Sequence, residues 1–274
     1  MSTSWTEWAI LSYWRERFPF RIFLPVVVFL AVPSLLSAGG ASRLATLSLL
    51  LGLVFQFRLW DDLGDVETDR IEFPERVLCR RRSVAPFYGL WLLVAVGVVV
   101  LLRGHRPLLV CYLVTVMAFF LWYRWLSSHA PPVLRYHVVA IKYPIFVYIA
   151  AGLSSESRGP LLAATMALVY LTFVVYEPLH DQRLHRLPGI NVVVGADVAL
   201  WTIAAAITFM LARGDSADSA PGSVLGPLAL AALALAIASY RRFRREADCT
   251  NYGRGIFLLA FVALLTLHGA NLWA

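Results

Sequence analysis

The sequence predicts an all-α fold, a polytopic membrane bundle of nine transmembrane helices. Of the 274 residues, 59% are hydrophobic and only 15% are charged, and the mean hydropathy is +0.70. This composition is typical of membrane proteins. A helix crosses the hydrocarbon layer with about 20 apolar residues. Nine segments have this character, namely 21–38, 43–60, 86–102, 107–126, 137–154, 160–177, 191–212, 222–239 and 255–272.

The first twenty residues form a separate N-terminal segment. Trp5, Trp8, Leu11 and Trp14 recur every three residues, which predicts a short helix lying in the membrane interface with its tryptophans toward lipid. Residues 21–274 are connected only by short loops, so we expect them to form one transmembrane domain. Loops of this length leave no room for a second soluble domain.

The basic residues indicate an orientation. Nearly all are arginines, and Lys142 is the only lysine. On a nine-span arrangement, nineteen of the 24 basic residues fall on one side and five on the other. The positive-inside rule places the richer side in the cytoplasm, with the N-terminus inside and the C-terminus outside the inner (cytoplasmic) membrane of the cell. Because these charges lie in short loops between apolar spans, we do not expect a nucleic-acid partner.

The strongest functional signal is the segment RLWDDLGDVETDRIEFPER, residues 58–76, which holds seven of the seventeen acidic residues. On a continuous helix, Asp62, Asp65 and Asp69 share one face, with Arg58 one turn before them. Carboxylates held together in a partly dry setting repel one another, and a divalent cation removes that repulsion. Mg²⁺ takes one or two carboxylates plus phosphate oxygens. The pattern therefore predicts a site for Mg²⁺ and a diphosphate, although a solvated helix end balanced by arginines remains the alternative.

A second acidic group ends the sixth apolar segment, in VVYEPLHDQRLHRLPG. Glu177 and Asp181 are four residues apart and fall on the same predicted side as the first cluster, so the two groups could hold two metal ions on one diphosphate. Pro178 weakens any argument from helical spacing, and an ordinary polar loop is an equal alternative. Asp197 lies inside the next apolar segment, as a proton acceptor or as a neutral carboxyl bonded to another helix.

These motifs resemble a known family. DDLGDVETD, Asp61 to Asp69, resembles the NDxxDxxxD signature of the UbiA-type intramembrane prenyltransferases, with Asp61 where the family usually has Asn. The nine-span count, the second acidic loop and the loop in which Tyr123, Pro131, Pro132 and Arg135 precede Lys142 are also similar to that family. The second motif, usually DxxxD, reads Glu177-Pro-Leu-His-Asp181. The following Pro74-Glu75-Arg76 resembles poorly characterised bacterial members.

The resemblance implies Mg²⁺-dependent transfer of an isoprenyl group from an allylic diphosphate to a lipophilic or aromatic acceptor within the membrane. It implies metal ligation by Asp61, Asp62, Asp65, Asp69, Glu177 and Asp181. Direct contacts with the substrate diphosphate are expected from Arg58, Arg135 and Lys142. Of these residues, Asp62, Asp65, Asp69 and Lys142 are expected to be catalytic. For Lys142, reaching back to the membrane surface is an equal alternative.

Three other functions remain open from the sequence. A UbiA-type terpene cyclase would use the same ionisation but close the chain on itself. A cation transporter would use the acidic groups as an ion path, although its carboxylates are expected near the bilayer centre. A non-catalytic relative would only bind a partner or lipid.

Overall fold

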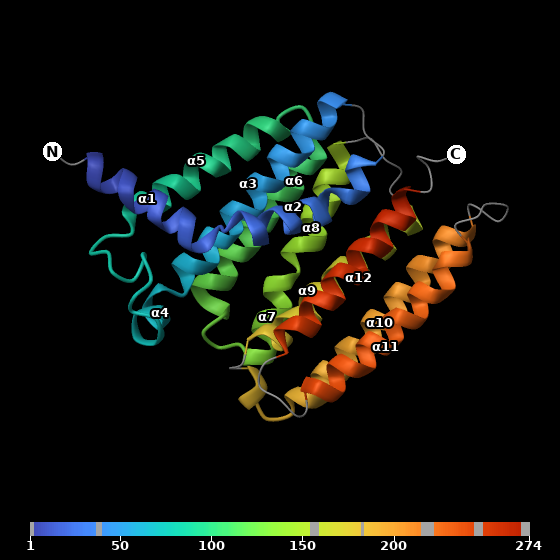
Figure 1. Cartoon of the computed structure of the whole chain (residues 1–274). Coiled ribbons are helices and arrows are strands. Elements are labelled where there is room, and N and C mark those ends of the chain that lie inside the picture. Colours follow the sequence, from blue (N-terminus) through green and yellow to red (C-terminus); the bar gives the residue numbers. More distant parts are fainter. Residues whose placement is uncertain are drawn as a thin grey trace.

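The computed structural model describes residues 3–36, 40–153, 159–181, 184–214, 222–243 and 249–269. Within these residues the chain is helical and has no strand, which confirms the all-α prediction. Figure 1 shows long helices packed side by side, with α10 and α11 along one edge and α5 at the other. The elements are α1 Thr3–Arg17, α2 Phe20–Leu35, α3 Gly40–Gly64, α4 Val66–Glu72, α5 Ala85–Leu102, α6 Arg106–Leu121, the π-helical turn η1 Trp122–Leu126, α7 Pro132–Ala140, α8 Lys142–Leu153, α9 Pro160–His180, the 3₁₀ turn η2 Leu184–Arg186, α10 Ile190–Gly214, α11 Gly222–Phe243 and α12 Thr250–Gly269.

Among the described residues, helical structure lies in each of the nine predicted segments, and six spans are long and apolar enough to cross a membrane. These six are Arg43–Gly64, Ala85–Leu102, Arg106–Leu126, Pro132–Leu153, Pro160–His180 and Ile190–Thr208, among the residues described. The pair α1 and α2, bent by 67°, would make a seventh if it counts as one span, and the apolar part of α12 is shorter. Large apolar side chains of α5 and α6, such as Leu93 and Val114, are exposed, as expected for lipid-facing helices.

Proline and glycine mark several helix ends. Proline occupies the first turn of α5, α6, α7 and α9, where its missing N–H leaves no intrahelical bond unmade. Gly189 has φ of 74° in the turn that leads into α10, a conformation that favours glycine. These residues fix where the apolar helices begin.

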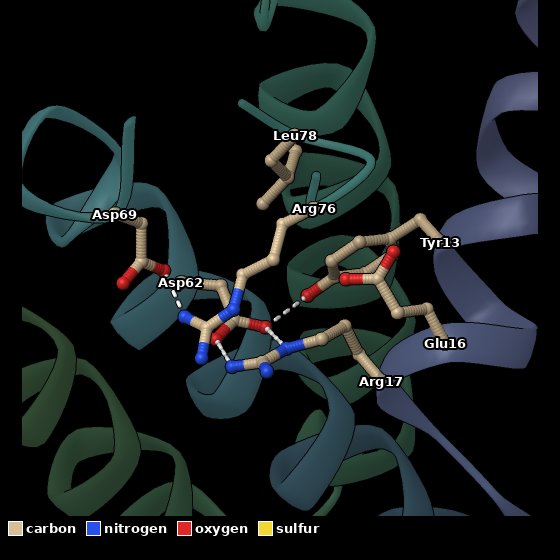
Figure 2. A pocket seen from close by; sticks show the side chains of 7 residues that line it. All are labelled: Tyr13, Glu16, Arg17, Asp62, Asp69, Arg76 and Leu78. Atoms are coloured by element: carbon tan, nitrogen blue, oxygen red, sulfur yellow. Dashed lines mark hydrogen bonds and ion pairs between the residues drawn. The ribbon is translucent and has the colours of Figure 1, made fainter. Parts of the chain in front are cut away.

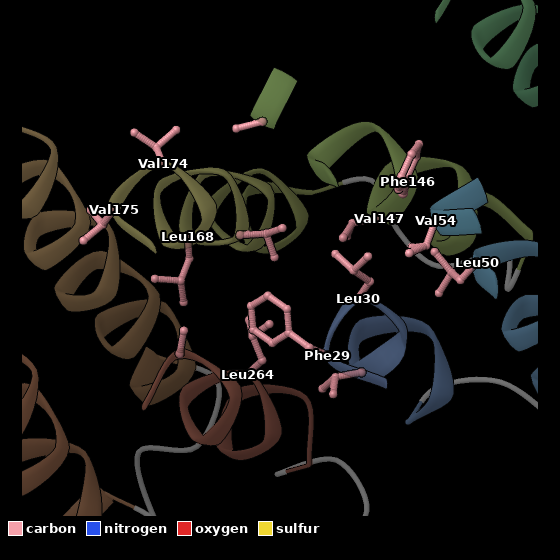
Figure 3. Close-up of a cluster of buried hydrophobic side chains, with 14 of the residues drawn as sticks. Phe29, Leu30, Leu50, Val54, Phe146, Val147, Leu168, Val174, Val175 and Leu264 are labelled. Carbon is pink, nitrogen blue, oxygen red and sulfur yellow. The ribbon is translucent and has the colours of Figure 1, made fainter. Parts of the chain in front are cut away.

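The main core lies where α2, α3, α8, α9 and α12 meet. Figure 3 shows Phe29 and Leu30 of α2 close to Phe146 and Val147 of α8 and Leu264 of α12. Helix α9 packs against α8, α10 and α12, and so joins the two sides of the bundle. Close packing of this kind, rather than hydrophobic burial, holds helices together in lipid.

A second core places α1 against α3 and α5. Tyr13 of α1 is buried with Leu59 of α3 and Phe87 of α5. The sequence correctly predicts the α1 helix, but Trp14 stacks on Phe18 with ring centroids 5.1 Å apart and also meets Phe55. Trp14, expected to face lipid, therefore packs within the protein, and α1 is positioned to contribute residues to the acidic cluster.

Candidate functional site

The first acidic cluster lies at a break between two helices. Helix α3 ends at Gly64 and α4 begins at Val66, while Asp65 between them has φ of −94° and ψ of 0°. The Asp69 N–H still donates to the Asp65 carbonyl oxygen at 2.8 Å. Asp62 and Asp69 therefore lie on two different helices, and not on the continuous helix that their spacing assumes. The break gives each carboxylate its own surroundings.

Asp62 is 4% exposed and is held by α1. The Arg17 Nε donates to its Oδ2 at 2.9 Å, Arg17 Nη2 donates to its Oδ1, and the Tyr13 hydroxyl donates to Oδ2 at 2.8 Å. The Arg58 Nη2 lies 3.5 Å from Oδ1. Two guanidinium groups thus balance one buried carboxylate, as a buried charge requires.

Asp69 is also buried and is held by the loop that follows α4. Arg76 Nη1 donates to Asp69 Oδ2, and the Arg76 guanidinium lies over the ring of Phe73, 3.9 Å from its centroid. The next residue, Val77, donates its N–H to Glu16 Oε2 at 3.0 Å. These contacts join the loop to α1.

Figure 2 shows Arg17 and Arg76 reaching toward Asp62 and Asp69 from two directions. The side chains drawn there enclose a hollow of only about 10 Å³. A ligand pocket has about 300–1,000 Å³. This part of the site is therefore closed by the chain's own side chains.

Asp61 has a different pair of partners. The Tyr123 hydroxyl donates to its Oδ1 and the Lys142 ammonium to its Oδ2. Lys142 is 2% exposed, so the chain's only lysine is enclosed in the protein. Lys142, expected to contact a diphosphate or to reach the membrane surface, bonds to Asp61 in the structure.

Asp65 is the member of this cluster without an internal cation. Its side chain is exposed, and among the described residues it has no hydrogen-bond or ion-pair partner. Partial burial by the surrounding chain, together with the charges of Asp61, Asp69 and Asp62, raises the pKa of Asp65 to about 6. Solvent screens this repulsion in part.

The second acidic group reaches the same site through Glu177. Helix α9 continues through Pro178 to His180, and the Asp181 N–H donates to the Glu177 carbonyl oxygen at 2.8 Å. The Glu177 carboxylate is exposed and interacts electrostatically with Arg58 and Lys142. The same two basic side chains therefore act on carboxylates of both acidic groups. Asp181 lies just beyond the end of α9 and is half-buried.

Arg135 points elsewhere. Its Nε donates to the Ala130 carbonyl oxygen at 3.0 Å and its Nη2 to that of Ser128 at 3.4 Å. The side chain is exposed and supports the loop before α7. The structure does not bring Arg135, expected to contact a diphosphate, to the acidic cluster.

Whether the acidic groups fit Mg²⁺ depends on which carboxylate oxygens are available. Among the described residues, no group of three or more His, Cys, Asp or Glu side chains is arranged around a common metal position. Asp61, Asp62 and Asp69 are each bonded to a basic side chain. An all-carboxylate cage is therefore not what this arrangement offers. Mg²⁺ needs only one or two carboxylates beside phosphate oxygens and water, and Asp65 is an exposed carboxylate of this cluster that no basic side chain holds among the described contacts.

A third polar group lies around Asp197, which is 4% exposed in α10. The Tyr136 hydroxyl donates to Asp197 Oδ2 at 3.1 Å, and His137 Nε2 is 3.6 Å from the same oxygen. His137 Nδ1 is 3.1 Å from the Tyr170 hydroxyl. The carboxyl is thus bonded to another helix, one of the two expectations from the sequence.

A stacked pair of aromatic rings lies beside the lysine. Tyr143 lies flat on Phe173 of α9, with centroids 3.5 Å apart and planes 8° apart, and the Lys142 ammonium is 5.5 Å from the Tyr143 centroid. The Tyr143 hydroxyl interacts electrostatically with Asp61 and Arg58. An aromatic wall therefore borders the charged site, where ring faces favour cations.

Sequence reasoning did not assign Tyr13 or Arg17 to the cluster. Each comes from an element that is distant along the chain or follows a loop, and Arg17 is 45 residues from Asp62. Only the unusual density of arginines around the acidic segment hinted at internal pairing.

Comparisons of the whole chain with protein-family models, with curated proteins and with solved structures found no match.

Proposed function

We propose that this chain is a Mg²⁺-dependent membrane prenyltransferase of the UbiA type. It would transfer an isoprenyl group from an allylic diphosphate to a lipophilic acceptor. One observation carries the proposal. Four aspartates, together with Arg17, Arg58, Arg76 and Lys142, gather at the ends of apolar helices, beside an aromatic wall. Such a site combines cations for a diphosphate with an apolar surround for its hydrocarbon chain.

The proposal includes the nine-span arrangement and its orientation. The helices over all nine predicted segments and the bias of basic residues support a cytoplasmic site with the N-terminus inside and the C-terminus outside. Membrane lipids would then surround the exposed apolar faces of α5 and α6. The chain would lie in the cytoplasmic membrane of its cell.

In the reaction we propose, Arg17, Arg58 and Arg76 bind the diphosphate oxygens. Arg58 interacts electrostatically with carboxylates of both acidic groups, while Arg17 and Arg76 would exchange their carboxylates for phosphate oxygens. Asp65 and Glu177 would hold Mg²⁺, joined by Asp62 and Asp69 once their arginines have turned. Bound Mg²⁺ withdraws charge from the leaving diphosphate.

The residues around the reacting carbon have two further tasks. The enclosed helix faces exclude water, which would otherwise capture the allylic cation. Tyr143 on Phe173 offers a ring face that favours positive charge. Because the hollow between Arg17 and Arg76 is so small, substrate entry requires α1 and the α4–α5 loop to separate from α3.

The test is diphosphate release by the purified protein supplied with Mg²⁺ and an allylic diphosphate. We expect release by the wild type and its loss in Asp62→Asn and in Asp65→Asn. Glu67→Gln is the matched control, because Glu67 is exposed and pairs only with its neighbour Arg70 among the described contacts. Wild-type rates in both aspartate variants would refute the metal assignment.

A second measurement separates transferase from cyclase. A labelled panel of allylic diphosphates is incubated with membranes containing the protein, and the products are identified by mass spectrometry. Release that needs an added acceptor supports the transferase. An acceptor-free cyclic hydrocarbon would instead assign the chain as a cyclase.

A further inference from the structure

Lys142 differs from the other basic residues of the site in its exposure. Its side chain is 3% exposed, whereas those of Arg17, Arg76 and Arg58 are 17%, 25% and 41% exposed. An arginine at the rim can turn from a carboxylate to a phosphate while solvent supports its charge. The Lys142 ammonium has no such route, because an enclosed charge that loses its partner is strongly destabilising.

Both carboxylate oxygens of Asp61 already accept from side-chain donors. Tyr123 bonds to one carboxylate oxygen and Lys142 to the other. A metal ion at Asp61 would lie beside the Lys142 ammonium, and the two positive charges would repel each other. Neither donor has another acceptor in the contacts of the described residues.

Two backbone irregularities bring these donors to Asp61. Tyr123 lies in the π-helical turn η1, which interrupts the α-helical pattern after α6. Lys142 is the first residue of α8, directly after the break at Ile141 that ends α7. π-Helical turns are rare and frequently occur at functional sites. Two independent helices thus depart from regular geometry at one carboxylate.

We infer that the Lys142 ammonium is a permanent internal cation on Asp61, in the place of a divalent ion. Asp61 is then a positioning residue that holds Lys142 and Tyr123 and does not bind metal, although it begins the acidic motif. This inference rests on the proposed function only for the existence of a metal site nearby. It removes Asp61 from the expected metal ligands and leaves Asp65 and Glu177. Asp62 and Asp69 would become ligands when the substrate binds and their arginines turn to the diphosphate.

The experiment counts metal ions. Mn²⁺ binding to the purified full chain is titrated by electron paramagnetic resonance, with and without inorganic pyrophosphate. Lys142→Met keeps the length of the side chain but removes its charge, and should bind one additional Mn²⁺ ion per chain at the vacated carboxylate. The double variant Asp61→Asn/Lys142→Met should return to the wild-type number.

The double variant also keeps the test decisive if Lys142→Met fails to fold. It leaves no unpaired charge, so we expect it to fold. If Asp61 were a metal ligand, the double variant would bind fewer Mn²⁺ ions than the wild type, which would overturn the inference. A folded Lys142→Met protein that binds no additional ion would overturn it as well.

The outcomes also separate this inference from the proposed function. A wild type that releases no diphosphate from allylic substrates refutes the transferase. The extra Mn²⁺ ion in Lys142→Met would still show that the ammonium occupies a cation position. Conversely, an active enzyme whose ion count falls in the double variant refutes only the role given to Lys142.

Discussion

The Arg17 guanidinium donates two hydrogen bonds, from Nε and Nη2, to the carboxylate of Asp62, which lies 45 residues away in the sequence. The contact ties α1 to the end of α3 and supplies a fixed cation to a carboxylate that is 4% exposed. Bidentate pairs of this kind are among the stronger hydrogen-bonded contacts in proteins. The N-terminal helix is therefore part of the candidate site.

Replacing Arg17 should weaken the docking of α1. In Arg17→Gln the Asp62 carboxylate keeps Tyr13 and Arg58 but loses its bidentate partner, so we expect a loss of about 1.5–3 kcal/mol, the range for hydrogen bonds to charged groups. Thermal unfolding in detergent measures the change. Arg15→Gln, at an exposed position of the same helix, is the control and should unfold like the wild type. Equal melting temperatures for both variants would contradict the docking role.

The pH dependence of stability should depend on Asp65 in the metal-free protein. Its pKa is raised from 3.8 to about 6 in the folded chain, so folding favours the protonated carboxyl. That contribution is fully present below about pH 3.8 and is lost as the pH rises through about 6. We expect Asp65→Asn to unfold at a higher temperature than the wild type at pH 7.5, and to vary less between pH 4 and 6.

The measurement is a series of melting curves with a chelator present. Glu67→Gln is the control, because the Glu67 side chain is 85% exposed. Its melting temperature should follow the wild type across the series. An Asp65→Asn profile parallel to the wild type would show that this carboxyl does not titrate differently on folding.

The hydrogen bond between Tyr136 and Asp197 should stabilise the contact between α7 and α10. Tyr136→Phe leaves a buried carboxyl with one donor fewer, at an expected cost of about 1–3 kcal/mol. Tyr88→Phe, at a side chain 52% exposed on α5, is the matched control. A double-mutant cycle with Asp197→Asn isolates the pair, and additive losses would mean that the two residues are not coupled.

Two glycines should respond oppositely to alanine. A Cβ at Gly253 would lie 3.0 Å from Tyr176 Cδ2, where α12 meets α9, and Tyr176 is itself stacked on His180. Overpacking costs about 1–3 kcal/mol and exceeds the helix-propensity gain of about 1 kcal/mol. Gly97 has no atom within 4 Å of such a Cβ. We therefore expect Gly253→Ala to lower the melting temperature and Gly97→Ala to raise it; a rise in both would show that Tyr176 yields.

The sequence correctly predicts helix in the apolar segments, because a long run of apolar residues must be buried or face lipid. It does not predict their interruptions. Segment 107–126 divides into α6 and η1, the segment expected from residue 137 starts at Pro132 and breaks at Ile141, and the acidic helix breaks at Asp65. Each interruption lies next to a charged or aromatic contact with another helix. Local propensity does not contain that information.

The candidate site is predictable only in part, for the same reason. Helical spacing identifies the aspartates as candidate site residues. Lys142 is recognisable as another because it is the only lysine and lies in an apolar segment. Which base meets which acid depends on the tertiary arrangement, so Arg17 and Arg76 are not recognisable as partners from sequence spacing. Arg135 carries the right charge near the right loop but bonds to backbone carbonyls instead.

The basic partners of the adjacent residues Asp61 and Asp62 are synthesised at different times. Arg17 precedes Asp62 by 45 residues, whereas Lys142 follows Asp61 by 81. Because synthesis starts at the N-terminus, Arg17 is already present when Asp62 is made. Asp61 has no Lys142 ammonium to pair with until later helices emerge from the ribosome. The ion pair of Asp61 can therefore form only after α8 has been synthesised.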